Sequence, residues 1–166
     1  MKLILTLFLS LTFTICNSQN EKPYREPFKL DLVVNTEHNY GMDVAKTPYF
    51  VKEKILQIYP GEKVLIETEV KSDSIFSMKV VEKNLNPEKT IEVDFFQDAK
   101  DRAKISMFLN VKNPFNKTLK HDALMYTVEG GQWEKTSIIP IRPKLENFET
   151  WGYAIITLVL DNWRLE

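Results

Sequence analysis

The sequence predicts an all-β protein, an antiparallel β-sandwich of about seven to nine strands. Three observations predict this class. Apolar residues recur at every second position in several short segments, as in strands with one buried face. Turn residues separate these segments, and no segment has a convincing helical period. The chain has 166 residues, 43% hydrophobic and 27% charged, so one domain with a sizeable core is expected.

The expected strands follow one another along the chain with short connections. The first alternates Phe28, Leu30 and Leu32 with polar residues, and the last is a nearly continuous apolar run that is typical of a strand covered on both faces. Residues 46–57 offer one helical turn, but Pro48 and Pro60 favour a strand there. The nine expected strands are residues 28–34, 55–59, 64–70, 75–82, 91–96, 105–112, 119–128, 133–141 and 153–160.

Turn residues set the strand boundaries. In Tyr59-Pro60-Gly61-Glu62, Pro and Gly occupy the two central positions that a type II turn prefers. Four further breaks are expected at Ser72-Asp73-Ser74, at Asn84-Leu85-Asn86-Pro87, at Asn113-Pro114-Phe115-Asn116 and at Gly130-Gly131.

A long loop is expected at residues 143–152, between two strongly predicted strands, and it is rich in large apolar side chains. Loops at the ends of a sandwich vary without disturbing the core, so recognition is often found there. We therefore expect a ligand-binding surface formed by Phe148, Trp151 and Tyr153. In the alternative, Phe148 and Trp151 close the end of the core, because aromatic side chains bury a large apolar area.

The first eighteen residues have the pattern of a signal peptide. Lys2 supplies a positive charge, and residues 3–15 form an uncharged apolar run that is too short to span a membrane. The small residues Cys16 and Ser18 predict cleavage after Ser18, which gives a soluble exported protein that begins at Gln19. In the alternative, Cys16 is acylated and anchors a lipoprotein.

The mature chain is expected to consist of an extended leader, residues 19–27, and a single sandwich domain, residues 28–166. Cys16 is the only cysteine, so this mature chain has no disulfide framework, no cysteine-based zinc site and no cysteine nucleophile. The domain must therefore be held together by its core.

The residues with catalytic or ligating chemistry form no recognisable pattern. His38 and His121 lack metal-ligand spacing, and His121 and Asp122 are strand neighbours that should point to opposite faces. The chain contains no Gly-x-Ser-x-Gly elbow and no glycine-rich phosphate loop. We expect no catalytic residues, no metal and no cofactor. A calcium ion at Asp94, Asp98 and Asp101 is the alternative, although these residues lack an EF-hand spacing.

One element resembles known families. Residues 109–115, Leu-Asn-Val-Lys-Asn-Pro-Phe, end an apolar strand in an Asn-Pro turn, and a return strand follows from Leu119. This resembles bacterial immunoglobulin-like domains and the "water stress and hypersensitive response" domains. The whole mature sequence is similar to small exported proteins of Gram-negative bacteria that have no assigned function. The resemblance implies an antiparallel immunoglobulin-like β-sandwich and no activity.

These observations predict an exported protein of the periplasm or cell surface of a Gram-negative bacterium. We expect a non-enzymatic binding or accessory module whose partner is an envelope protein or a glycan. The alternative is a carbohydrate-binding module or a glycan-active enzyme that uses aromatic and acidic residues. The net charge of −1 favours no nucleic-acid partner, and membrane attachment is expected only through an acylated Cys16.

Overall fold

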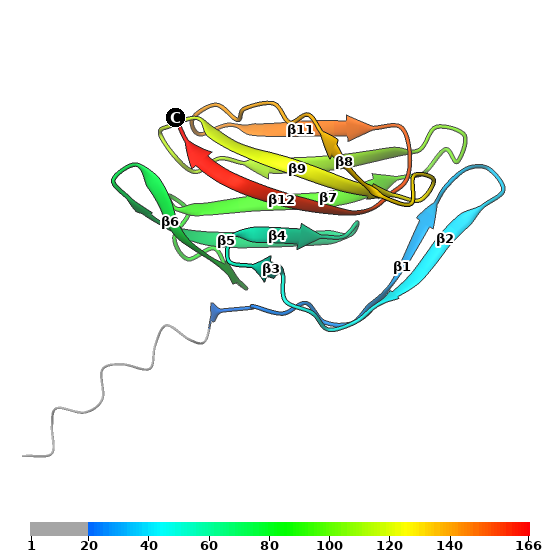
Figure 1. Ribbon diagram of the computed structural model, residues 1–166, viewed down its shortest axis with the longest axis horizontal. Helices are drawn as coiled ribbons and strands as arrows, with labels where there is room; N and C mark the ends of the chain where they lie inside the picture. The colour runs from blue at the N-terminus through cyan, green and yellow to red at the C-terminus, as the bar shows by residue number, and fades with distance from the viewer. Residues whose placement is uncertain (1–19) are drawn as a thin grey trace, which may run out of the picture.

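The computed structural model describes residues 20–166, so the expected signal peptide and Cys16 lie outside the described residues. The described chain is all-β, as the sequence predicts, with twelve strands in two five-stranded antiparallel sheets and one separate hairpin (Figure 1). This number exceeds the seven to nine strands that we expect from the sequence. Among the described residues, no helix is long and apolar enough to cross a membrane.

The two large sheets each contain five antiparallel strands. Sheet I consists, in spatial order, of β11 (Glu146–Trp151), β8 (Ser106–Lys112), β7 (Thr90–Asp98), β5 (Glu62–Lys71) and β6 (Ser74–Val81). Sheet II consists of β10 (Trp133–Thr136), β9 (Leu119–Thr127), β12 (Ile155–Leu165), β4 (Ile55–Ile58) and β3 (Phe50–Lys52).

One core fills the space between the sheets. Alternation along β5 directs Val64 and Ile66 inward, and alternation along β12 does the same for Leu158 and Leu160; all four are at most 1% exposed. Each such side chain contributes roughly 1.5–3 kcal/mol relative to an exposed one. The period of two in the sequence therefore arises because every second side chain of a strand packs into this core.

The hairpin of β1 (Phe28–Val33) and β2 (Asn39–Val44) lies at one end of the sandwich, and the C-terminus lies at the other (Figure 1). A second apolar cluster holds it, in which Leu30, Leu32 and Val44 pack with Ile156 at the start of β12. Gln97 of β7 fixes its far end, because its side-chain amide donates to and accepts from the backbone of Val33 at 2.9 Å in each direction.

The predicted turns have the expected geometry. The Glu62 N–H donates to the Tyr59 carbonyl at 3.1 Å, and Gly61 has φ +92°, as the third residue of a type II turn requires. In the β8–β9 turn, the buried Asn113 amide donates to the carbonyls of Lys117, Ile141 and Arg142. The Asn-Pro element is therefore an anchor that ties this turn to the connection after β10.

Three expectations about strands are wrong. Residues 143–152 are mostly strand β11 rather than a loop, because β8 pairs with them through the backbone from Glu146 to Trp151. Strand β2 has no counterpart among the nine expected strands, and β10 ends at Thr136 rather than near Ile141. Strand β3 lies within residues 46–57, where the prolines favour a strand.

The missed strands β2 and β11 differ in their sequence patterns. β2 alternates Tyr40, Met42 and Val44 with exposed residues, so its period of two is present in the sequence and the prediction overlooks it. β11 alternates only between exposed and half-buried residues, and its half-buried face contains the polar Asn147 and Glu149, so an apolar period of two is missing there.

Candidate functional site

The sandwich has two sides on which the edge strands of the two sheets face each other. On one side, which we call the N-terminal side, the edge strands are β3 and β6. On the other side, which we call the groove side, they are β10 and β11. Both sides are crossed by a segment of irregular chain, and the two crossings differ in how completely their polar groups are satisfied.

On the N-terminal side, residues 20–25 are hydrogen-bonded first to Sheet I and then to Sheet II. The Lys22 N–H donates to Val80 at the edge of β6, and the Arg25 N–H donates to Thr47 just before β3. The segment that we expect to be an extended leader is therefore docked on both sheets, and it covers the edges that they would otherwise expose.

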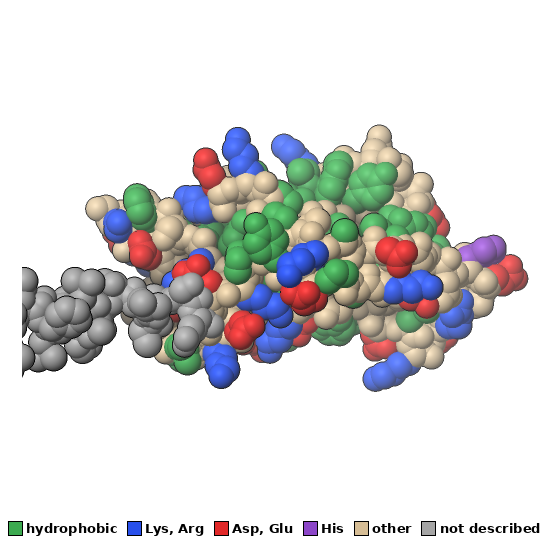
Figure 2. Space-filling view, turned by 90° about the horizontal axis from the view of Figure 1, so that it is seen from below, with side chains coloured by type: hydrophobic (Ala, Val, Ile, Leu, Met, Phe, Trp, Pro, Cys, Tyr) green, Lys and Arg blue, Asp and Glu red, His purple; other side chains and the backbone are tan. Residues whose placement is uncertain are grey.

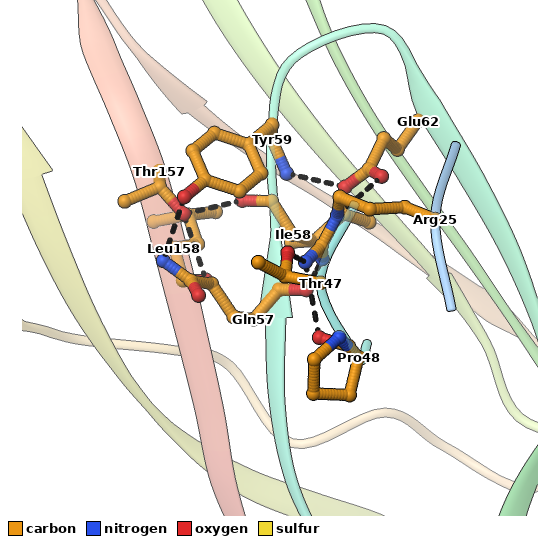
Figure 3. Close-up of polar contacts among 9 residues, drawn as sticks. All are labelled: Arg25, Thr47, Pro48, Gln57, Ile58, Tyr59, Glu62, Thr157 and Leu158. Carbon is orange, nitrogen blue, oxygen red and sulfur yellow. Dashed lines mark hydrogen bonds and ion pairs between the residues drawn. The ribbon is translucent and has the colours of Figure 1, made fainter. Parts of the chain in front are cut away.

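The Arg25 guanidinium fixes this crossing (Figure 3). Its Nε donates to Glu62 Oε1 at 2.9 Å, its Nη1 donates to the Thr47 hydroxyl and the Pro48 carbonyl, and its Nη2 donates to the Gln57 carbonyl. The Arg25 side chain is 1% exposed and the Glu62 side chain 9% exposed. Four of the five donors that a guanidinium offers are thus used within the protein.

Two tyrosine rings enclose the ion pair. The Arg25 Cζ lies 4.8 Å from the ring centre of Tyr49 and 5.1 Å from that of Tyr59. Burial raises the pKa of both tyrosines above 10.0, so both hydroxyls stay protonated. The enclosed and nearly saturated Arg25 has little capacity for a ligand, and its role is to hold residues 20–25.

On the groove side, the pairing of β9 with its neighbour is interrupted. Thr136 is the register partner of Ala123, and Ile141 next pairs with Leu119. Four residues, 137–140, thus oppose the three residues 120–122, so the longer segment bows away from the sheet. Sheet I holds the bow, because the Ile139 N–H donates to Glu149 Oε1 at 2.7 Å.

The bow leaves a groove of about 670 Å³ over β9 and β12. Its apolar lining comes from Ala123, Leu124, Val159 and the bow itself, and its charged lining comes from side chains of both signs. The charged residues are Lys120, Asp122, Lys135, Asp161 and Arg164. Charges of both signs are also interspersed over the face shown in Figure 2.

The charges in the groove are only partly neutralised by the protein. Asp122 accepts from Arg164 Nη1 at 3.1 Å and from Asn162 Nδ2 at 2.9 Å, and these bonds lower its pKa below 3.8. Among the described residues, Lys135 and Asp161 make no ion pair. Asp161 is also the cross-strand partner of Asp122, which places two carboxylates side by side.

His121 lies at the inner edge of the groove. Its ring is 4.6 Å from that of Trp163, and burial lowers its pKa from 6.5 to about 4, so it is neutral at neutral pH. Within the described chain, His121 Nε2 and Trp163 Nε1 have no hydrogen-bond partner. As the alternation predicts, His121 is buried and Asp122 is exposed.

The structure does not bring Phe148, Trp151 and Tyr153 to one surface. Phe148 and Trp151 are an odd number of residues apart on β11, so they point to opposite faces. Phe148 is 53% exposed, whereas Trp151 packs against the core and donates from Nε1 to the Thr136 hydroxyl at 3.0 Å. Tyr153 is half-exposed beyond the strand, and its hydroxyl contacts Met125 Sδ.

Sequence reasoning does not find the groove, since it arises from a mismatch of one residue between two paired segments. Pro140, which cannot donate to a neighbouring strand, is the one local signal that the pairing fails there. Asp98 and Asp101, considered above for calcium, accept from nearby backbone N–H groups in the β7–β8 connection. No group of three His, Cys, Asp or Glu residues suited to a metal occurs within residues 20–166.

Comparisons of this chain with protein families, with curated proteins and with solved structures found no match.

Proposed function

We propose that the protein is an exported, non-enzymatic binding module whose ligand occupies the groove over β9 and β12. The observation that carries this proposal is the bow of residues 137–140, which Sheet I holds away from β9 so that a lined cavity stays open. The unpaired charges of Lys135 and Asp161 within it are the kind of convergent polar groups that orient a ligand.

Binding is better supported than glycan hydrolysis. Asp122 and Asp161 are adjacent carboxylates, as a glycosidase would need, but hydrolysis also requires a carboxylic acid that keeps its proton. The bonds from Asn162 and Arg164 lower the pKa of Asp122, so Asp122 is ionised. Both aspartates are exposed, and no buried apolar pocket distinguishes one from the other.

Export is proposed from the sequence alone. The proposed location is the periplasm or the cell surface of a Gram-negative bacterium, and the proposed signal peptide is cleaved after Ser18. The test is N-terminal sequencing of the protein from a fractionated Gram-negative host, in which we expect a chain that begins at Gln19. Palmitate labelling that disappears in Cys16→Ser would instead establish the lipoprotein alternative. The relationship to immunoglobulin-like domains also stays a prediction, supported by the two facing antiparallel sheets and the Asn113 turn.

Binding at the groove can be tested by amide NMR spectra of the mature protein. The probes are neutral hexasaccharides (cello-, xylo-, manno- and maltohexaose), short acidic and basic peptides, and inorganic phosphate. We expect at least one class to shift the resonances of residues 120–124, 135–139 and 159–164. If no class shifts them at millimolar concentration, the proposed function is wrong.

A further inference from the structure

We propose that the ligand of the groove is a neutral carbohydrate chain that lies along the outer face of β9. This inference rests on the proposed function and specifies the chemistry of the same site. It follows from the balance of charge in the groove, from the order of side chains along the sheet, and from the fact that the groove opens on a sheet face.

The balance of charge disfavours a charged ligand. The lining has three cationic side chains and two carboxylates. An anion would lie against Asp122 and Asp161, whereas a cation would lie against Lys120, Lys135 and Arg164. A purely apolar ligand would remove these groups from water without replacing their hydrogen bonds, which is costly. The groove therefore suits an uncharged ligand that can both donate and accept.

Sugar hydroxyls meet this requirement, since each hydroxyl donates one hydrogen bond and accepts two. Lys135 can donate to such a group. Asp161 can accept from one, because its carboxylate receives a single bond from the protein, the Asn162 N–H at 2.6 Å. Between them, the register places Leu124 beside Val159, an aliphatic surface suited to the C–H faces of pyranose rings.

The side chains on the outer face form an elongated strip. Along β9, Tyr126, Leu124, Asp122 and Lys120 alternate with buried residues and share one face. At roughly 3.4 Å per residue, the strip is about 20 Å long. At one end, Trp133 is the cross-strand partner of Tyr126, is 46% exposed and contacts the Tyr126 ring edge-on at 5.4 Å. An exposed indole beside a polar groove can stack on a sugar ring.

A peptide fits the groove less well than a sugar chain. Extended peptides gain affinity by adding a strand to an exposed sheet edge. The groove instead opens on a sheet face, where β9 is paired with β12 and, from Ala123 onward, with β10. Only residues 120–122 lack a register partner on the β10 side, which is too short a stretch for strand addition, so side chains are the main groups that the groove presents to a ligand.

The experiment measures affinity for the four neutral hexasaccharides by calorimetry and NMR titration. Lys135→Ala, Asp161→Asn and Trp133→Ala change the groove strip. Matched controls are Lys29→Ala and Asp43→Asn, an exposed cross-strand pair on the hairpin, and Phe148→Ala, an exposed aromatic on Sheet I. Because all six side chains are exposed or half-exposed, the variants should fold, and circular dichroism verifies this.

We expect at least one hexasaccharide to bind, and each groove variant of Lys135 or Asp161 to weaken it roughly tenfold or more, as the loss of a hydrogen bond to a charged group predicts. The three controls should leave the affinity unchanged. If only a peptide or phosphate shifts the groove resonances, the carbohydrate inference is overturned while the proposed function stands. If the sugar binds and the controls weaken it as much as the groove variants do, the site is elsewhere.

Discussion

Each side of the sandwich is crossed by irregular chain that joins the edges of the two sheets. The two crossings differ in how completely their polar groups are hydrogen-bonded. On the N-terminal side, Arg25 makes four hydrogen bonds, one of which is its ion pair with Glu62, and is 1% exposed. On the groove side, His121 Nε2 and Trp163 Nε1 lack partners in the described chain, and Asp161 stands beside another carboxylate.

The difference shows which side is built for stability. A buried polar network rigidifies a structure when it is satisfied and costs free energy when it is not. Groups that break the ordinary rules of packing and pairing are expected at functional sites. The N-terminal side therefore acts as a lock, and the groove side retains the exposed charges of Lys135 and Asp161, which have no ion-pair partner among the described residues.

The largest effect should come from Arg25→Met. This change leaves Glu62 buried without its partner, which typically costs ~3–5 kcal/mol. Urea unfolding monitored by circular dichroism measures the loss. In the double variant Arg25→Met, Glu62→Gln, much of the loss should be recovered because no unpaired charge remains.

The exposed ion pair of Lys46 and Glu26, at 3.3 Å, is the control for Arg25. Lys46→Met should change stability by less than ~1 kcal/mol, because solvent screens an exposed pair. Equal losses in Arg25→Met and Lys46→Met would show that the N-terminal crossing is not the lock inferred here.

The next effect concerns the link between the two sheets on the groove side. Trp151→Ala removes core packing and the hydrogen bond to Thr136, so we expect a loss of ~3 kcal/mol. The exposed Phe148→Ala on the same strand should lose less than ~1 kcal/mol. Thermal unfolding separates the two outcomes. A Trp151→Ala variant with an unchanged melting temperature would contradict the packing role and favour an exposed stacking platform.

A smaller effect should appear as pH dependence on the groove side. Because the folded pKa of His121, about 4, lies below the ordinary 6.5, the folded state binds fewer protons than the unfolded state between these values. Stability is therefore full above pH 6.5 and falls as the pH decreases towards 4, by roughly 2 kcal/mol between pH 7 and pH 5.

Urea unfolding at pH 7, 6 and 5 measures this slope, in a range above the ordinary carboxylate pKa values. His121→Phe, which keeps a ring against Trp163 and cannot be protonated, should flatten the slope. His38→Phe, at the exposed tip of the hairpin, should leave it as it is. A wild-type protein equally stable at pH 7 and pH 5 would contradict the buried, neutral His121.

The contrast between the two sides also separates what the sequence predicts from what it does not. Strands such as β5, with Val64 and Ile66 facing the core, are predictable because burial of one face leaves a period of two. The Pro60-Gly61 turn is predictable because its backbone geometry demands these residues. Both signals are local.

The remaining features depend on partners far away in the chain. Arg25 lies in a polar, proline-flanked segment, and nothing near it in the sequence indicates that Glu62 and Gln57 will enclose it. The groove depends on a bow of residues 137–140 and on a hydrogen bond to Glu149 of the other sheet. β11 is missed because its exposed face carries Glu146, Phe148 and Thr150. This mixture of a charged, an aromatic and a polar side chain is not typical of either a buried or a solvent-exposed strand face.

The smallest effect, and the one that relates most directly to function, should be a gain of stability. Asp122 and Asp161 are cross-strand partners on the solvent face, and like charges in that position repel. Asp161→Asn removes the repulsion and keeps an oxygen that can accept from the Asn162 N–H, so we expect a gain of ~0.2–1 kcal/mol at pH 7. The gain should shrink in 1 M NaCl, where the Debye length is about 3 Å. The matched Asp43→Asn on the hairpin removes a carboxylate opposite Lys29, so it should not be stabilising. If Asp161→Asn gains stability while losing sugar affinity, the carboxylate is retained for the ligand; if it loses stability, Asp161 supports the fold and the contrast between the two sides fails at this residue.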